Sequence, residues 1–274
     1  MICIDLRKNE TDLFKIGQFP DGEPTFEFKK ELDRKECYLV IISINNPTKL
    51  YILGLVCDIL NRHGVTFEVH ITYLMSARMD RVMDFKRPYS LKVICSILEA
   101  FNNDTLFVLE PHSSKLTEIN RNIIDEHICS EIIFNLFNKV NTVFINPDEG
   151  AFHRNSFNMP KYITFDKVRD LSTGNIIGHD INPKLSNITS IPKEDALVVV
   201  DDLCDGGRTF VSIANKLKEI APDNKRYIYV THMVNPLGIK NLSENYDIVY
   251  FTDSYKDWNA ETLPENVTCI PVEV

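Results

Sequence analysis

The sequence lacks the features that mark membrane-spanning, zinc-binding and secreted proteins. No apolar run reaches the ~18 residues that a membrane-spanning helix needs. The seven cysteines are scattered, without a Cys-x-x-Cys pair or another zinc-ligand spacing. The opening MICIDLRKNE is too charged, and its apolar part too short, for a signal peptide. These absences predict a cytoplasmic protein whose cysteines are reduced.

An excess of basic residues is also missing. The 274 residues carry 39 Asp and Glu against 30 Lys and Arg, which gives a formal net charge of −9. This balance argues against an electrostatic nucleic-acid binder, so local basic groups are expected to bind small anions. Low-complexity tracts and flexible linkers are absent too, and the length suffices for two α/β domains of ordinary size.

Short apolar strands alternate with amphipathic helices along the whole chain. Strands are expected at 37–43, 65–73, 105–109, 142–145, 162–165, 197–200, 226–230 and 247–251. Helices are expected at 50–62, 88–101, 129–137, 208–220 and 236–243. Such alternation is typical of parallel sheets covered by helices on both faces. A second series begins near Asn138, so two similar domains are predicted, residues 1–138 and 139–274, with 170–194 as a mobile loop.

The most informative stretch is 197–210, LVVVDDLCDGGRTF. Two carboxylates, Asp201 and Asp202, follow a buried-strand pattern, and DGGRT (205–209) then leads into an amphipathic helix. The carboxylates suit the vicinal hydroxyls of a ribose. Glycine amides, the Thr209 hydroxyl and the helix N-terminus suit a phosphate. The pattern predicts a site for a phosphorylated sugar, and the plain alternative is a tight turn with solvated acids.

Chemically useful side chains follow other predicted strands. Arg78 and Arg81 come soon after strand 65–73, where the alternative is a charged surface loop. His112 and Asp148 follow strands 105–109 and 142–145, at equivalent places in the two halves. A lone histidine there is more often structural. A histidine and an aspartate beside a phosphate loop nevertheless indicate a magnesium–diphosphate site.

Six short motifs occur in an order that resembles the ribose-phosphate diphosphokinases, or phosphoribosyl pyrophosphate synthetases. They are FPDGE (19–23), ARMDR (77–81), EPH (110–112), NPDEG (146–150), DKVRD (166–170) and VDDLCDGGRT (200–209). The motifs span nearly the whole chain, although each is weak alone; Pro-Asp-Gly, for example, is ordinary turn chemistry. The resemblance implies an α/β fold of two tandem type I phosphoribosyltransferase-like domains, each a mainly parallel sheet flanked by helices. The first domain would serve ATP and the second the ribose phosphate.

The resemblance also implies roles for individual residues. ATP would be bound by Phe19, Asp21, Glu23, Arg78, Asp80 and His112. The Mg²⁺ that accompanies ATP would be held by His112 and Asp148. Catalysis would rest on Lys167 and Arg169 of a flexible loop, which without the resemblance read as a solvated charge pair. The ribose hydroxyls and 5-phosphate would be bound by Asp201, Asp202, Asp205, Gly206, Gly207, Arg208 and Thr209.

The implied reaction transfers the β,γ-diphosphate of ATP to the anomeric hydroxyl of ribose 5-phosphate, giving phosphoribosyl pyrophosphate and AMP. Arg208 stands where the family usually has a small residue, and Gly206 where it has threonine. The added guanidinium suits a second phosphate, so ADP-ribose is an alternative acceptor, with a role in NAD synthesis.

More distant alternatives are a phosphoribosyltransferase and an inactive regulatory relative. The ATP motifs of the first half argue against the former, and the presence of Lys167, Arg169 and His112 argues against the latter. The resemblance further implies a homodimer or homohexamer, with the segment 81–91 reaching a neighbouring subunit.

Overall fold

The computed structural model describes residues 1–101, 105–120, 122–155, 159–169, 176–259 and 261–273, without the side chains of Arg169, Ile176 and Ile177. The described residues form two compact units. Unit 1 comprises Met1–His127, the short segment Ser254–Asp257 and the residues from Val272 onward. Unit 2 comprises Ile128–Asp253 and Trp258–Pro271.

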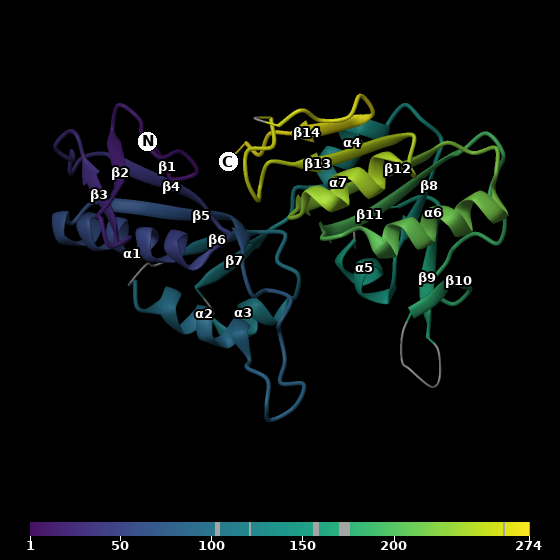
Figure 1. Cartoon of the computed structure of the whole chain (residues 1–274), viewed down its shortest axis with the longest axis horizontal. Coiled ribbons are helices and arrows are strands. Elements are labelled where there is room, and N and C mark those ends of the chain that lie inside the picture. The colour runs from purple at the N-terminus through teal and green to yellow at the C-terminus, as the bar shows by residue number, and fades with distance from the viewer. Residues whose placement is uncertain (102–104, 121, 156–158, 170–175, 260, 274) are drawn as a thin grey trace. The chain divides into compact units, whose positions relative to one another are not determined.

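Unit 1 is built on a parallel sheet with the strand order β1-β4-β5-β6-β7 (Figure 1). Its strands are β1 (Ile2–Asp5), β4 (Cys37–Ile44), β5 (Thr66–Leu74), β6 (Leu106–Leu109) and β7 (Ile123–Glu126). The helices are α1 (Pro47–His63), α2 (Ser90–Glu99) and α3 (Lys115–Ile119), and β2 (Phe14–Gln18) with β3 (Pro24–Phe28) forms a separate antiparallel hairpin. Apolar side chains of β4, β5, α1 and α2 make one buried core. This core fixes the ends of β5 and β6, from which the predicted ATP residues follow.

Unit 2 is built on a mixed sheet with the order β10-β9-β8-β11-β12-β13-β14. Its strands are β8 (Thr142–Asn146), β9 (Tyr162–Arg169), β10 (Ile176–Asn182), β11 (Ala196–Cys204), β12 (Arg226–Met233), β13 (Ile248–Thr252) and β14 (Val267–Ile270). Its helices are α4 (Cys129–Phe137), α5 (Glu149–Arg154), α6 (Arg208–Ile220) and α7 (Pro236–Ser243). The neighbours in the sheet run parallel, except that β10 runs antiparallel to β9.

The α/β class and the parallel sheets flanked by helices are confirmed. Two differences from the sequence expectation concern unit 2. The structure groups α4 with unit 2, ahead of the boundary expected after residue 138, because Ile133 and Phe137 pack in one core with Val198 of β11. The stretch 170–194 holds the strand β10, which was not predicted because an edge strand pairs on one side only and carries polar side chains. No helix among the described residues is long and apolar enough to cross a membrane.

The segment Ser254–Asp257 lies far along the chain but completes unit 1. The Ser43 hydroxyl and the Asn45 amide both donate to the Tyr255 carbonyl, at 2.7 and 2.9 Å. The Thr72 hydroxyl donates to the Ser254 carbonyl at 2.7 Å. The ring of Tyr255 meets that of Tyr73 edge to face, with centroids 5.0 Å apart. The ends of β4 and β5 are therefore held by a segment that follows β13.

Candidate functional site

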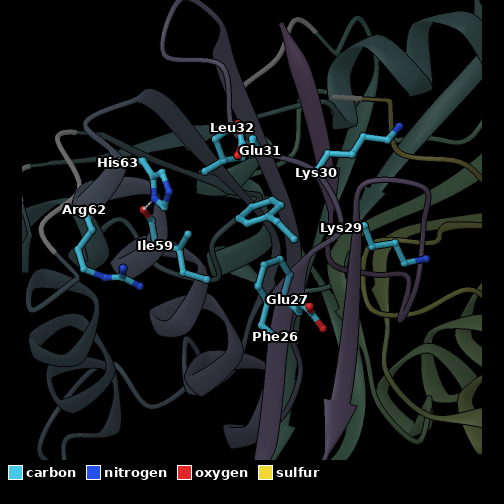
Figure 2. A pocket seen from close by; sticks show the side chains of 10 residues that line it. Phe26, Glu27, Lys29, Lys30, Glu31, Leu32, Ile59, Arg62 and His63 are labelled. Carbon is cyan, nitrogen blue, oxygen red and sulfur yellow. Dashed lines mark hydrogen bonds between the residues drawn. The ribbon is translucent and has the colours of Figure 1, made fainter.

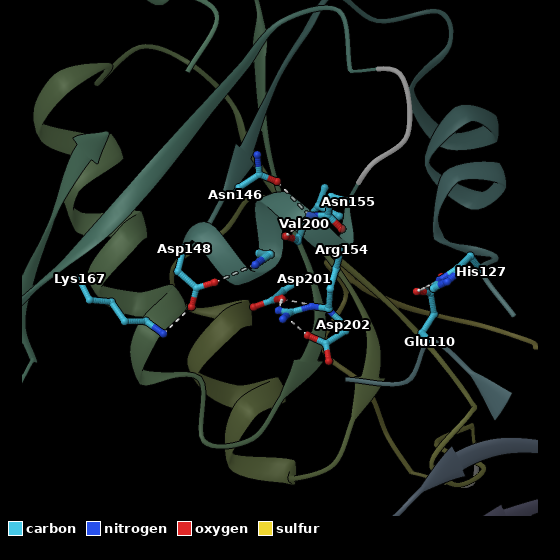
Figure 3. A network of polar contacts seen from close by, with 11 residues as sticks. Glu110, His127, Asn146, Asp148, Arg154, Asn155, Lys167, Val200, Asp201 and Asp202 are labelled. Carbon is cyan, nitrogen blue, oxygen red and sulfur yellow. Dashed lines mark hydrogen bonds and ion pairs between the residues drawn. The ribbon is translucent and has the colours of Figure 1, made fainter. Parts of the chain in front are cut away.

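A pair of aspartates follows the continuously buried residues 196–200 of β11, and one arginine bridges them (Figure 3). The Nη2 of Arg154, the last residue of α5, lies 2.7 Å from Asp201 Oδ1 and 2.9 Å from Asp202 Oδ1. Burial and the neighbouring Asp202 raise the pKa of Asp201 well above the usual aspartate value, and the Arg154 guanidinium opposes this shift. Two nearly buried carboxylates thus share one cation. Sequence reasoning found both aspartates and missed Arg154.

The other end of α5 holds the predicted metal ligand beside a predicted catalytic lysine. Asp148 caps α5, with its Oδ1 accepting from the Ala151 N–H at 2.8 Å. Its Oδ2 accepts from Lys167 Nζ at 2.5 Å (Figure 3). Burial alone would raise the pKa of Asp148, but the hydrogen bonds from Lys167 and Ala151 lower it below its ordinary value. Asp148 therefore presents an ionised carboxylate that is held in a fixed place.

Lys167 belongs to strand β9, where a flexible loop was expected. Arg169 is the last residue of the same strand, and its side chain is outside the described residues. Lys167 forms an ion pair with Asp148 and belongs to a strand of the sheet. The alternative interpretation, a freely solvated charge, therefore does not apply to it.

A histidine that sequence reasoning missed lies opposite Lys167. His179 of β10 is the register partner of Lys167, and its Nδ1 lies 2.9 Å from the hydroxyl oxygen of Ser212 on α6. The residue is buried, and its Nε2 has no hydrogen-bond partner among the described residues. Burial, and then the charge of Lys167, lower the pKa of His179, so the imidazole is neutral at neutral pH. It was missed because its segment was read as a loop.

The predicted phosphate loop joins β11 to α6. Gly207 adopts a left-handed conformation (φ 76°) that glycine accepts without cost, and α6 begins directly after it. The N-cap residue Gly207 has no side chain to cap this helix, so the first backbone N–H groups of α6 are suited to an anion. Thr209 is half-buried and Arg208 is exposed. The arrangement suits a phosphate group.

Helix α7 supports this loop from behind. The Asn241 amide donates to the Gly206 carbonyl at 2.7 Å, and the Asn235 amide donates to Asp205 Oδ1 at 3.0 Å. Gly238 packs so closely that a Cβ there would lie 2.2 Å from the Asp205 carbonyl oxygen. Sequence reasoning missed these supports, because they approach the loop only after α7 has folded onto the sheet.

In unit 1, the two predicted ATP segments begin at unusual backbone positions. Ser76 follows β5 with φ 70°, and Glu110 follows β6 with φ 41°, both left-handed for residues other than glycine. Such conformations cost of order 1–3 kcal/mol and cluster at functional sites. Ser76 lies two residues before Arg78 and four before Asp80, and Glu110 lies two residues before His112.

The side chains of these segments are held by local contacts. Asp80 is buried, and its Oδ1 accepts from Arg81 Nε at 3.0 Å. Burial would raise the pKa of Asp80, but the hydrogen bonds from Arg81 and Ser113 lower it. Glu110 Oε2 lies 3.0 Å from His127 Nδ1, a contact that raises the pKa of the histidine. The turn after β6 is thus anchored to the end of β7.

The predicted adenine residues lie at the tip of the β2–β3 hairpin. Asp21 Oδ1 accepts from the Glu23 N–H at 3.1 Å, and Glu23 Oε1 accepts from the Tyr51 hydroxyl of α1 at 3.2 Å. The ring of Phe19 is 55% exposed. An exposed ring next to two fixed carboxylates offers a stacking face and hydrogen-bond acceptors to a base.

A separate pocket of about 500 Å³ lies at the other end of β3, against the end of α1 (Figure 2). Phe26, Phe28, Leu32 and Ile59 give it an apolar lining, and charged side chains surround them. None of the residues predicted for ATP, metal or sugar phosphate lines it.

The described residues contain no group of three or more side chains arranged to hold a metal ion. His112 belongs to unit 1 and Asp148 to unit 2. Magnesium in phosphate chemistry keeps several waters and takes one or two carboxylates plus the phosphates of the substrate. The ionised Asp148 fits that donor set.

Comparison with known proteins finds sequence similarity to one group of enzymes. No family model matches it. The ribose-phosphate pyrophosphokinase of Pyrococcus abyssi is 28% identical over 229 residues, covering 80% of this chain and 76% of that protein. Those of Clostridium perfringens and Mycoplasmopsis pulmonis are 24% and 25% identical, covering 80% and 90% of this chain and 70% and 77% of their own lengths.

A solved structure is similar over almost its whole length. It is the phosphoribosylpyrophosphate synthetase from Mycobacterium smegmatis, with a TM-score of 0.76 at 15% sequence identity, covering 98% of this chain and 94% of that one. The resemblance read from the six motifs and the expected fold are both confirmed.

Proposed function

We propose that this chain is an ATP-dependent ribose-phosphate pyrophosphokinase. It transfers the β,γ-diphosphate of ATP to the anomeric hydroxyl of ribose 5-phosphate and forms AMP and phosphoribosyl pyrophosphate. The observation that carries the proposal is the order along β11 and α6, where a nearly buried pair of aspartates is followed by a glycine turn and then by a helix start without a side-chain cap. The likeness to ribose-phosphate pyrophosphokinases supports it and makes the protein a transferase of nucleotide synthesis. The proposed location is the cytoplasm.

Unit 2 positions the acceptor. Asp201 and Asp202 accept from two ribose hydroxyls, while Gly206, Gly207, Thr209 and the start of α6 bind the 5-phosphate. These contacts hold the sugar at both ends and leave its anomeric hydroxyl to attack. Orientation of this kind supplies a large part of the rate in phosphoryl-type transfer, which needs little covalent help from the protein.

Unit 1 binds the donor through Phe19, Asp21, Glu23, Arg78, Asp80 and His112. When the anomeric oxygen attacks the β-phosphorus, the bond to the α-phosphate oxygen breaks and AMP leaves. Lys167 and Arg169 bring positive charge to the transferred diphosphate and to the departing AMP, where negative charge grows in the transition state. His179, whose imidazole is buried and neutral, lies beside Lys167 and adds no second positive charge there.

Magnesium is the proposed cofactor, held by Asp148 and His112 together with the ATP phosphates. When bound, it neutralises phosphate charge and helps to orient the diphosphate. Asp148 suits this role because Lys167 and the Ala151 N–H keep it ionised and in place.

The product test is direct. ATP and ribose 5-phosphate with Mg²⁺ are expected to give AMP and phosphoribosyl pyrophosphate in equal amounts, measured by mass spectrometry. EDTA is expected to stop the reaction, and added Mg²⁺ to restore it. ADP as the nucleotide product would contradict the proposal, since it would mean transfer of the γ-phosphate alone.

The same experiment with ADP-ribose separates the two acceptors. The relatives named above give this alternative no specific support. Arg208, the residue that suggested it, lies exposed at the first position of α6. Ribose 5-phosphate therefore stays the proposed acceptor, and faster turnover of ADP-ribose would overturn that choice.

A homodimer or homohexamer is proposed as the active assembly. In the segment expected to reach a neighbour, Val82, Met83 and Phe85 are exposed, and Phe85 is fully so. Exposed apolar groups of this kind mark protein contacts. Light scattering is expected to show at least a dimer, and Phe85→Ser is expected to weaken it. A fully active monomer would contradict the shared assembly.

A further inference from the structure

Arg154 has a place in unit 2 that the six motifs do not explain. A single nitrogen, Nη2, reaches one oxygen of each aspartate, at 2.7 Å and 2.9 Å (Figure 3). The side chains of Asp201 and Asp202 are only 13% and 5% exposed, and that of Arg154 is 23% exposed. A charge-assisted contact so shielded from water orients its carboxylates more firmly than a surface ion pair does.

Hydrogen bonds fix the end of α5, and they therefore restrict the position of the Arg154 guanidinium. The amide of Asn155 donates to Asn146 Oδ1 at 3.0 Å and to the Val200 carbonyl at 3.1 Å. These bonds tie the end of α5 to β8 and to β11, the strand that carries both aspartates. The absence of a side chain at Gly150 leaves room for the guanidinium beside α5, because a Cβ there would lie 3.2 Å from both Arg154 Nη1 and Asp148 Oδ1.

We infer that Arg154 is a positioning residue for the sugar, which holds Asp201 and Asp202 as two oriented hydrogen-bond acceptors for the vicinal hydroxyls of the ribose. The inference rests on the proposed function and extends it to a residue outside the motifs. Without Arg154, two adjacent carboxylates repel each other, and one of them takes up a proton or turns away. Either change removes an acceptor on which a hydroxyl pair depends.

The charged and titratable groups that face Asp201 are Asp202 and Cys204 on β11 and Arg154 on α5. Loss of the guanidinium removes the cation that opposes the raised pKa of Asp201. The carboxyl is then protonated up to a higher pH. Binding of ribose 5-phosphate to an Arg154 variant is therefore expected to fail at a higher pH than binding to the wild type.

The test measures binding of ribose 5-phosphate by calorimetry across the acid range, and the KM values for both substrates. Arg154→Gln is expected to weaken ribose 5-phosphate binding about tenfold or more, with the KM for ATP within about twofold. Arg154→Lys is expected to restore part of the affinity. The matched control is Lys216→Gln, which removes a cation paired with Asp180 and Glu219 at 3.5 Å on the surface of unit 2 and is expected to change neither value.

Removal of the guanidinium takes away the cation that the two carboxylates share, so the folding of Arg154→Gln is checked by its melting temperature. If it does not fold, Arg154→Lys decides, because its shorter side chain keeps a cation but cannot reach both aspartates as Nη2 does, so it is expected to weaken ribose 5-phosphate binding with the KM for ATP little changed. Unchanged sugar affinity in a folded Arg154→Gln, or in Arg154→Lys, would overturn the inference. If the wild type neither binds ribose 5-phosphate nor forms AMP, the proposed function itself fails.

Discussion

Lys167→Ala is expected to lower kcat by a factor of about a hundred to a thousand, while the KM for ATP changes little. A cation that meets charge developed in the transition state contributes about 3–4 kcal/mol, and little of this is felt in the ground state. The structure adds a second reason. Lys167 is the partner of Asp148, so its loss also frees the carboxylate proposed for Mg²⁺. The measurement is steady-state kinetics with both substrates varied, and Arg169→Ala is expected to act in the same direction.

The chain offers a matched control for this lysine. Lys161 lies just before β9, and its Nζ is 2.5 Å from Asp195 Oδ2, a geometry like that of Lys167 with Asp148. Lys161→Ala leaves the buried Asp195 without its cation, so it is expected to lower the melting temperature and to keep kcat. Near-normal kcat in Lys167→Ala would show that the assignment of the catalytic lysine is wrong.

Gly238→Ala is expected to lower the melting temperature by about 2–12 °C and to weaken binding of ribose 5-phosphate. The new Cβ would lie 2.2 Å from the Asp205 carbonyl oxygen and 2.9 Å from Cys204 Sγ, so either α7 or the phosphate loop must move. Overpacking of this kind costs about 1–3 kcal/mol, and each kcal/mol shifts the melting temperature of such a chain by about 2–4 °C. Calorimetric melting and sugar-phosphate titration measure the two effects.

The control is a glycine with open space around it. Gly178 of β10 has no heavy atom within 4 Å of the position of a Cβ, so Gly178→Ala is expected to leave both measurements nearly unchanged. If Gly238→Ala melts and binds like the wild type, the packing of α7 against the phosphate loop contributes neither to stability nor to sugar-phosphate binding.

The fold was predictable because each of its central strands is a continuous apolar run in the sequence. The apolar run 197–200 and the two aspartates after it lie in β11, and the glycines lie at the turn into α6, where the sequence predicted a turn. Local signals of this kind need no knowledge of other parts of the chain. The edge strand β10 gave no such signal, because strand formation there depends on pairing with β9.

The candidate site was predictable only in part, for the same reason. Asp201, Asp202 and Asp148 follow strands and could be read from position. Arg154 meets Asp201 across 47 residues of sequence, and Asn241 meets Gly206 across 35. Neither contact leaves a spacing or a periodic pattern in the chain. His179 combined both difficulties, since it lies in a strand that was not predicted and its register partner is Lys167 of the preceding strand, β9.

The segment Ser254–Asp257 has a consequence for the way in which this chain can be divided. Since it belongs with Met1–His127, the polypeptide leaves unit 1, returns to it after β13 and leaves it again. No single cut yields two complete pieces. A fragment that stops before α4 would lack the backbone carbonyls that receive Ser43, Asn45 and Thr72. The two units are therefore expected to fold completely only when they are expressed as one chain, although each has a sheet and a core of its own.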